Sequence, residues 1–328
     1  MRLIKGLLII AITSILCFAD DTQENKSVLN SLYEKVILKD LNSSLKSIDE
    51  LKESIKKSDI KKSKEGFTKL VQTWKSVETF YILGDLNDDF IDTPRYIDTF
   101  HNLSEDITAQ LDRAIKSSDE VRVALFKNSL KSISALEYIL YKKDIKDKRV
   151  NEIALTIVNK IGSYLSDINE EYLAQKENFL KDLKKANSIT INAIIQSTYK
   201  LKEWRIGDIM GATKKYEGKP DNSRAEYYIS KNSANAIEAI LKTYKNIFDN
   251  KSYEDYGDYL LKITNGEQIK RLRESINKSL ELVKKIENDD LLKAGDLYEE
   301  ISEIHVILFL EIIEELSINA KIIEADGD

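Results

Sequence analysis

The segment SISALEYILY, residues 132–141, carries a single carboxylate among apolar and hydroxyl side chains. On a helix, Ser134, Glu137 and Tyr141 fall at i, i+3 and i+7 and share one face, beside an apolar stripe. Glu137 is therefore a candidate binding residue, and the alternative is a polar position that only flanks the stripe. A buried carboxylate is costly without a partner, so we expect one for Glu137, either Arg205 or a bound metal.

A second candidate set surrounds His101, one of only two histidines in the chain. On a helix, Asp98, His101 and Glu105 occupy i−3, i and i+4, so one imidazole and two carboxylates would share a face that suits Zn²⁺ or Fe²⁺. The alternative is an ordinary acidic surface helix. The other histidine, His305, lies among apolar residues, which favours a hydrogen-bonded core position.

The sequence motifs of the common enzymes are missing. Helical zinc peptidases use His-Glu-x-x-His, with two imidazoles one turn apart, whereas the two histidines here are far apart in sequence. The chain has one cysteine, Cys17, and neither a glycine-rich phosphate loop nor a dinucleotide fingerprint. A serine and a histidine brought together by folding stay open as an alternative. Sixteen tyrosines, Tyr227 among them, could supply phenolates to ferric iron, although packing is the favoured role.

Helices must position all of these candidates. Only two prolines and eleven glycines interrupt the chain, and apolar residues recur every three or four positions. This pattern predicts an all-α protein made of two tandem helical bundles. The helices are expected at about 28–58, 64–84, 95–116, 119–143, 147–185, 188–206, 223–249, 266–287 and 291–318.

A break near KKANSIT separates the two expected bundles. We assign 20–186 to an N-terminal helical bundle and 187–328 to a C-terminal helical bundle. Together they hold roughly 300 residues, enough chain for a substantial core in each.

The first nineteen residues, MRLIKGLLIIAITSILCFA, have the pattern of a signal peptide. Two basic residues precede an apolar run that is too short for a comfortable membrane span, and Cys17 and Ala19 place small residues at a cleavage site. We expect cleavage after Ala19 and export to the periplasm, with no membrane-spanning segment in the mature chain. Lipidation of Cys17 is a less favoured alternative, because the bulky Leu16 precedes it.

The charge pattern bears on the class of partner. The chain carries 50 basic and 56 acidic residues, and they are interspersed along it. Such a pattern is typical of a solvated helical surface and not of a phosphate-binding patch, so we expect no nucleic-acid partner. Because Cys17 lies in the leader, the mature chain is expected to contain no disulfide.

Several local motifs occur in an order that resembles a known family. RIGDIMG, residues 205–211, begins with Arg205 and is similar to Lys-Leu-Gly-x-Pro-Leu-Gly, with Gly207 and Gly211 kept. AEYYISKNSANAI resembles a helix start that has a glutamate and a serine where this chain has Glu226 and Ser230. The chain ends in ADGD. These motifs resemble those of the imelysin-like family, also called the M75 peptidase family, in which a terminal Asp-Gly-Asp is common. An early family helix is similar to WKSVETFYILG, with Trp74, Glu78 and Gly84.

The named motif of that family, Gly-x-His-x-x-Glu, resembles residues 132–137. Ser132 stands for the glycine, Ser134 stands for the histidine, and Glu137 is retained. A serine hydroxyl cannot replace an imidazole as a ligand for a transition metal or as a proton shuttle near neutral pH. The chain is thus identified as a divergent member that lacks the motif histidine, which puts any activity needing that histidine in doubt.

The resemblance implies a two-bundle periplasmic protein in which the motif helix faces the cleft between the domains. It also implies a binding or accessory role in iron acquisition, with iron or another divalent metal as the ligand and iron-uptake proteins of the cell envelope as partners. Two alternatives remain. One is an M75-type metallopeptidase whose site does not use the missing histidine, and the other is a non-catalytic protein-interaction module.

Overall fold

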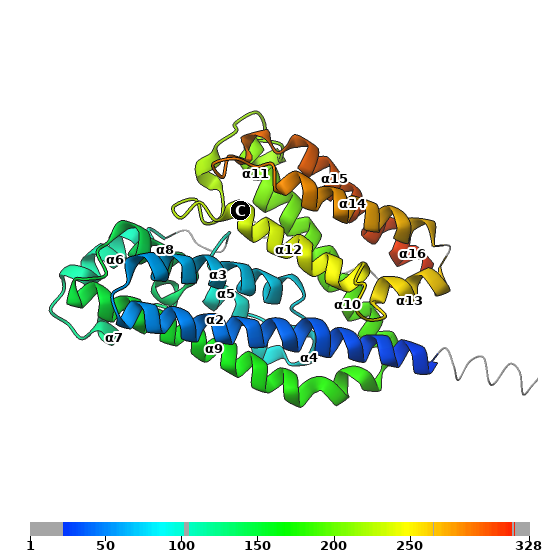
Figure 1. Cartoon of the computed structure of the whole chain (residues 1–328), viewed down its shortest axis with the longest axis horizontal. Helices are drawn as coiled ribbons and strands as arrows, with labels where there is room; N and C mark the ends of the chain where they lie inside the picture. The colour runs from blue at the N-terminus through cyan, green and yellow to red at the C-terminus, as the bar shows by residue number, and fades with distance from the viewer. Residues whose placement is uncertain (1–21, 102–104, 265, 317, 319–328) are drawn as a thin grey trace, which may run out of the picture.

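The computed structural model describes residues 22–101, 105–264, 266–316 and 318. Every regular element in these ranges is a helix, so the expected all-α class is confirmed (Figure 1). The signal-peptide segment, Cys17 and the terminal ADGD lie outside the described residues.

The first half of the chain is already helical over 22–32. It continues through η1 (Tyr33–Leu38), α2 (Lys39–Lys56), α3 (Ile60–Thr79), α4 (Leu83–Leu86), η2 (Asp88–Phe90), α5 (Thr93–Ile97), α6 (Ile107–Lys116), α7 (Val121–Ala124), η3 (Ser129–Lys131), α8 (Ile133–Lys142) and α9 (Lys148–Lys181).

The second half follows after a single residue, Asp182, whose carboxylate caps the next helix. Its elements are α10 (Leu183–Lys202), η4 (Glu203–Gly207), α11 (Asp208–Met210), η5 (Lys214–Tyr216), η6 (Asn222–Arg224), α12 (Ser233–Phe248), α13 (Tyr256–Ile263), α14 (Glu267–Val283), η7 (Leu291–Lys293), α15 (Gly295–Val306), η8 (Ile307–Ile312) and α16 (Ile313–Glu315).

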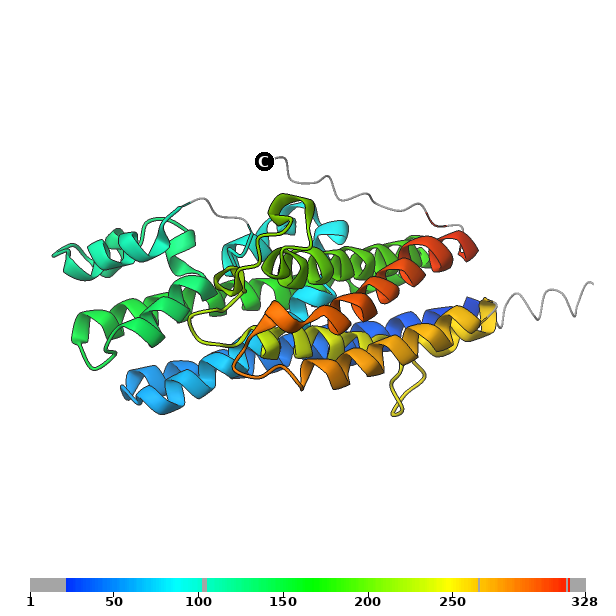
Figure 2. The same ribbon diagram turned by 90° about the horizontal axis from the view of Figure 1, so that it is seen from above.

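The long helices form two layers, and in Figure 1 the helices of the second layer run at an angle to those of the first (Figures 1 and 2). In one layer, α2 packs against α3 and α9, and α8 packs against the same two helices. In the other layer, α14 packs against α12 and α15, and α15 packs against α10. The layers meet where α3 packs against α12. The division into 20–186 and 187–328 as domains stays a prediction.

Three of the expected helices are not continuous in the structure, so these predictions are wrong. The range 95–116 is interrupted because Asp98 leaves the helical conformation after α5 and His101 adopts a positive φ of 59°. The range 119–143 is divided between α7 and α8 by a segment in which Ser132 caps α8. The range 223–249 becomes helical only at Ser233, because 225–232 forms turns.

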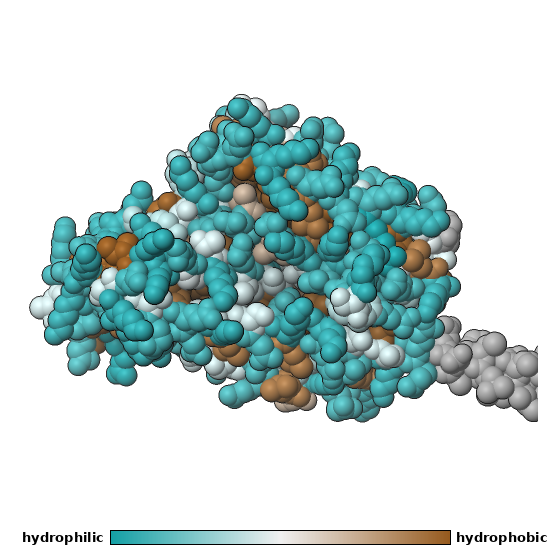
Figure 3. Space-filling model, in the orientation of Figure 1, coloured by the Kyte–Doolittle hydropathy of each residue, from teal (hydrophilic) through white to brown (hydrophobic). Residues whose placement is uncertain are grey.

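The core runs through both layers and includes Trp74, Tyr172 and Tyr244, all fully buried. The face of the molecule drawn in Figure 3 is mainly hydrophilic, with small and separate hydrophobic patches. Within the described ranges, no helix combines the length and the apolar character that crossing a membrane requires.

Candidate functional site

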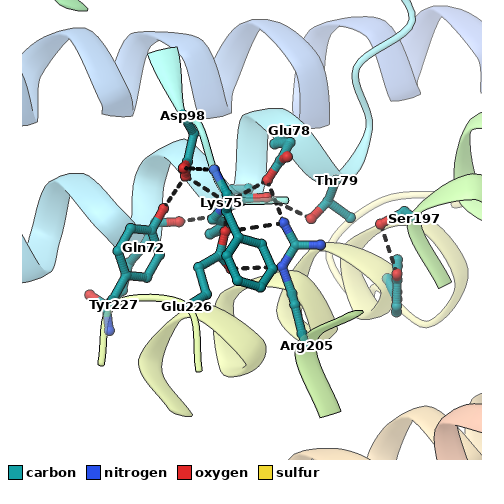
Figure 4. Close-up of polar contacts among 12 residues, drawn as sticks. Gln72, Lys75, Glu78, Thr79, Asp98, Ser197, Arg205, Glu226 and Tyr227 are labelled. Atoms are coloured by element: carbon teal, nitrogen blue, oxygen red, sulfur yellow. Dashed lines mark hydrogen bonds and ion pairs between the residues drawn. The ribbon is translucent and has the colours of Figure 1, made fainter. Parts of the chain in front are cut away.

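A buried lysine lies at the centre of a polar cluster between the two layers (Figure 4). Lys75 is on α3 and is completely buried. Its Nζ donates to Glu78 at 2.6 Å, to Asp98 at 2.9 Å and to Glu226 at 2.6 Å. Three carboxylates therefore share one ammonium group, and Glu226 comes from the second half of the chain.

A second buried cation, Arg205, reaches two of these carboxylates from η4. Its Nε donates to Glu226 at 2.7 Å, and one terminal nitrogen donates to Glu78 at 3.0 Å. η4 is a π-helix, an irregularity that often occurs at functional sites. Glu226 thus bridges Lys75 and Arg205, and the contact joins α3 to the start of the second layer.

Tyr227 completes the cluster beside Asp98. Its hydroxyl donates to the Asp98 carboxylate, and its ring lies 5.3 Å from the Lys75 ammonium. The backbone of Tyr227 has φ 58°, a left-handed conformation that is unusual for a bulky residue and costs about 1–3 kcal/mol. The buried contacts of the side chain offset this strain and hold the 225–232 turn against α3.

Glu137 is buried on α8 and also contacts the turn. Its carboxylate accepts hydrogen bonds from the backbone N–H of Ser230 at 2.8 Å and from the Ser230 hydroxyl at 2.6 Å. The expected pairing of Glu137 with Arg205 is wrong, because Arg205 binds Glu226 and Glu78 instead.

The motif histidine position, Ser134, lies beside the cluster. Its hydroxyl accepts a hydrogen bond from Thr99 at 3.2 Å, and Thr99 follows Asp98 directly. Ser134 therefore adjoins the loop that carries Asp98, one of the cluster carboxylates.

Burial and charge shift the pKa values of these groups in opposite directions. Burial alone would lower the pKa of Lys75, but Asp98, Glu226 and Glu78 raise it above its usual value. Burial opposes ionisation of Glu78 as well, yet Lys75 and Arg205 lower its pKa to about 2. The pKa of Glu226 is raised by burial despite the two cations.

Within the described part of the chain, no ion pair neutralises Glu137. Burial raises its pKa to about 7, against the opposing effect of the two hydrogen bonds from Ser230. The nearby carboxylates Asp98 and Glu226 raise it further. Glu137 is therefore a carboxyl group that exchanges its proton near neutral pH.

The proposed metal set of Asp98, His101 and Glu105 is not brought together. Asp98 belongs to the Lys75 cluster, and Glu105 is on the surface, where it accepts from Lys127 at 2.6 Å. The three residues do not share a helical face, because the helix ends before Asp98. The expectation fails because the loop directs each side chain to a different partner.

His101 instead joins the loop to the second half of the chain. Its Nε2 lies 2.9 Å from the buried carboxylate of Asp208, and its ring stacks on Trp204 at 4.6 Å between centroids. Asp208 also accepts from Thr213. The second histidine, His305, is hydrogen-bonded to Thr198, and burial lowers its pKa to about 4.

The two motif glycines have structural reasons. Gly211 ends α11 with φ 69°, and a Cβ there would lie 2.8 Å from the backbone nitrogen of Lys219. A Cβ on Gly207 would lie 2.9 Å from the side chain of Thr213. Both glycines allow the chain to fold closely around Asp208, next to Arg205.

The cluster does not fit a metal ion. Each carboxylate that a metal would need is already within 2.6–2.9 Å of the Lys75 ammonium, and Ser134 supplies no imidazole. In the part of the chain that the structure describes, no three acidic, histidine or cysteine side chains form a set that could hold a metal. The donor set is that of an internal ion cluster.

Sequence reasoning missed Lys75, Asp208 and the role of Tyr227. One signal for Lys75 was present, because it continues a series at four-residue spacing with the apolar Phe67 and Val71. A lysine in the buried stripe of a helix requires carboxylate partners. No comparable local signal identifies Tyr227, because its position depends on the turn.

Two solved structures share the fold of this chain. The chain resembles the crystal structure of an imelysin-like protein from Psychrobacter arcticum, at 16% identity and a TM-score of 0.77 over 92% of this chain and 98% of the other. It also resembles a structure described as an iron-regulated protein A precursor from Parabacteroides distasonis, at 12% identity and a TM-score of 0.67 over 90% and 95%. No curated protein matches the sequence.

A family match extends over most of the chain. Residues 35–304 match the family described as imelysin, Peptidase M75. The matched range contains all the cluster residues and both motif glycines. The chain therefore belongs to the imelysin family.

Proposed function

We propose that this protein is an exported, periplasmic component of iron acquisition that acts by binding, as an accessory protein, and not as an enzyme. The family membership supports this proposal, as does the resemblance to a protein described as iron-regulated and as a precursor. The leader-like pattern of residues 1–19 supports export.

One observation carries the proposal to the level of residues. The motif positions Glu78, Arg205 and Glu226 are joined in one buried network between the layers, and Glu137 with Ser230 lies beside it. Such a network fixes how the two halves are held together. It favours a binding role, which depends on the shape of the protein surface, over catalysis, which needs an open site.

The M75 metallopeptidase is the second candidate, and the family description is what favours it. Zinc peptidases need a metal with an open coordination position and a base next to it. The carboxylates of the cluster are already paired with Lys75 and Arg205, and this pairing favours the binding role.

A growth experiment tests the proposal directly. We expect a strain lacking the gene to grow more slowly than its parent when a chelator limits iron, and a plasmid copy to restore growth. Added ferric salt should remove the difference, because iron supply is then no longer limiting. Equal growth of the two strains under chelation would contradict the proposal.

Metal analysis of protein purified from the periplasm separates the alternatives. Iron at one atom per chain would support direct iron binding, and a metal-free protein retained by an envelope iron-uptake protein would support the accessory role. Zinc together with chelator-sensitive cleavage of unstructured peptides would establish the peptidase instead.

A further inference from the structure

A small cavity lies between the two layers, where α2, α3 and α12 meet. It has a volume of about 230 Å³. On α3, the lining residues Gln72 and Ser76 are near Lys75 in sequence, but the cavity lining includes none of the ion-cluster residues. The lining residues come from α2, α3 and α12, and they are Asp40, Ser43, Gln72, Thr73, Ser76, Ala239 and Lys242.

Asp40 is the unusual member of this lining. One oxygen of its carboxylate, Oδ2, is buried and has no hydrogen-bond partner among the described residues. A buried polar atom without a partner costs free energy, and in native proteins such an atom is commonly satisfied by water, an ion or a ligand. Burial raises the pKa of Asp40 to about 7, against the opposing effect of its chain neighbour Lys39.

The charged groups that face Asp40 do not neutralise it directly. Lys242 lines the cavity from α12, but its ammonium pairs with Glu238 at 2.9 Å. Tyr253 lies near enough for the Asp40 carboxylate to contribute to its raised pKa, although its hydroxyl donates to the Asn246 carbonyl.

The other polar groups of the cavity are mostly engaged within their own helices. The Ser76 hydroxyl donates to the Gln72 carbonyl, and the Thr73 hydroxyl donates to Lys69 and Leu70 carbonyls. Their oxygens keep lone pairs that can accept further hydrogen bonds. The cavity therefore offers one carboxylate and several acceptors, and its one lining ammonium group, Lys242, is paired with Glu238.

We propose that this cavity binds a small organic cation with N–H donors, a primary ammonium compound, whose ammonium group pairs with Asp40. A metal ion is less suited to the cavity, because a single carboxylate with hydroxyl groups is a weak ligand set for one. The volume is below that of drug-sized pockets, so the ligand has few heavy atoms. The site is separate from the imelysin motif positions and does not depend on the proposed role in iron acquisition.

Calorimetric titration of the mature protein tests this inference, with putrescine as the probe and butanediol as its neutral counterpart. We expect saturable binding of putrescine and none of butanediol at the same concentrations. Asp40→Asn should weaken putrescine binding by roughly tenfold or more, because a charge-assisted contact is lost. The matched control is Asp49→Asn, which changes an exposed carboxylate on the same helix and should leave binding unchanged.

The pH dependence provides a readout that a purely structural role would not produce. An ammonium ligand favours the ionised carboxylate, so binding should weaken as the pH falls from 8 to 6. For the same reason, binding should release protons. Asp40→Asn should abolish this dependence. Its circular dichroism spectrum, compared with that of the unchanged chain, shows whether the variant is folded.

Two outcomes would overturn the inference. One is no binding of putrescine to the folded protein at millimolar concentration, in which case Oδ2 is satisfied by water only. The other is equal binding by Asp40→Asn and the unchanged chain. Neither outcome affects the growth phenotype under iron limitation, so failure of this inference and failure of the proposed function are distinguishable.

Discussion

Lys75 gives the ion cluster a cation that belongs to the chain itself. Its ammonium group has contacts of hydrogen-bond length with three carboxylates, a geometry that a bound cation would otherwise provide. A buried ion pair contributes little net stability compared with apolar packing, but loss of one partner is strongly destabilising because a buried charge remains. The cluster therefore determines how the two halves of the chain pack together more than it adds net stability.

Replacing this lysine should destabilise the protein severely. Lys75→Met leaves three carboxylates with only Arg205 to neutralise them, and we expect a loss of about 3–5 kcal/mol in the free energy of unfolding. Urea denaturation followed by circular dichroism measures the change. Lys69→Met is the control, because Lys69 is half-exposed on the same helix and its pair with Glu50 is on the surface. Similar midpoints for both variants would contradict the central role of Lys75.

Removal of the lysine should also create a site for an added cation. In Lys75→Ala, the carboxylates of Glu78, Asp98 and Glu226 surround the space left by the side chain, and carboxylates suit Mn²⁺. We expect manganese to raise the melting temperature of Lys75→Ala more than that of the unchanged chain. Thermal melts with and without manganese provide the measurement, and an equal response of both proteins would refute the idea.

Glu137 should make stability depend on pH. Its pKa is raised to about 7 in the folded state from an ordinary value of 4.5. Because the folded state holds the proton more tightly, the stabilisation is complete below 4.5 and is lost as the pH rises through about 7. As the pH rises, Glu137→Gln should lose about 1–3 kcal/mol less of its free energy of unfolding than the unchanged chain loses. The reason is that the amide stays neutral while its oxygen still accepts from Ser230.

Denaturation curves recorded between pH 4 and pH 8 would show this effect as a flatter profile for Glu137→Gln. Glu152→Gln, at the exposed start of α9, is the control and should follow the unchanged chain. Parallel profiles for Glu137→Gln and the unchanged chain would mean that folding does not raise the pKa of Glu137.

Among the elements, the short segment that contains α11 depends on a glycine conformation. Gly211 and Gly218 have almost the same positive φ, 69° and 68°, but only Gly211 lies against another backbone segment. Gly218→Ala should therefore cost only the backbone strain, about 1 kcal/mol. Gly211→Ala should cost clearly more, because its Cβ would lie 2.8 Å from Lys219. Chemical denaturation of the two variants measures the difference. Equal losses in the free energy of unfolding would show that the backbone near Lys219 moves to make room for the added Cβ.

The sequence predicts the long helices well and the loops that carry the site poorly. The helix expected at 147–185 is observed at Lys148–Lys181, because its apolar face is continuous and Asp147 caps its start. The pattern predicts helix at 98–101 and at 225–232, where the structure has a loop and a turn. Their conformations depend on long-range contacts, such as Asp98 with Lys75 and Tyr227 with Asp98, which local periodicity cannot indicate.

The same limit applies to the candidate site. Glu137 could be singled out because it is the one carboxylate in an apolar helix, and the glycines of RIGDIMG stood out by type. The metal set around His101 failed because it assumed a helix where the chain turns. Side chains that meet across the layers, such as Lys75 and Glu226, are 151 positions apart in sequence, so no spacing rule connects them.

At the scale of the whole molecule, the cluster joins the two halves of the chain. Lys75, Glu78 and Asp98 come from the first half, and they pair with Arg205, Glu226 and Tyr227 from the second. Next to the cluster, α3 packs against α12. We therefore expect the halves to unfold together, as one cooperative unit, and to separate when the cluster is weakened.

The two tryptophans make this coupling measurable. Trp74 is buried in the first half of the chain. Trp204 is in the second half and stacks on His101 of the first. Trp204→Phe leaves a fluorescent reporter in the first half only, and Trp74→Phe leaves one in the second half only. In both proteins we expect the same urea midpoint. Arg205→Met, added to each, should separate the two midpoints, because a buried cation that pairs across the halves is lost.

Arg95→Met is the matched control, since Arg95 is exposed and pairs with Asp92 on the surface. It should leave the two midpoints together. Coincident midpoints in the Arg205→Met background would mean that apolar packing of α3 on α12 alone couples the halves. Midpoints that differ already without Arg205→Met would mean that the cluster couples them weakly. Whether the two midpoints coincide or separate therefore decides whether the ion cluster or the helix packing makes the two halves of the chain one cooperative structure.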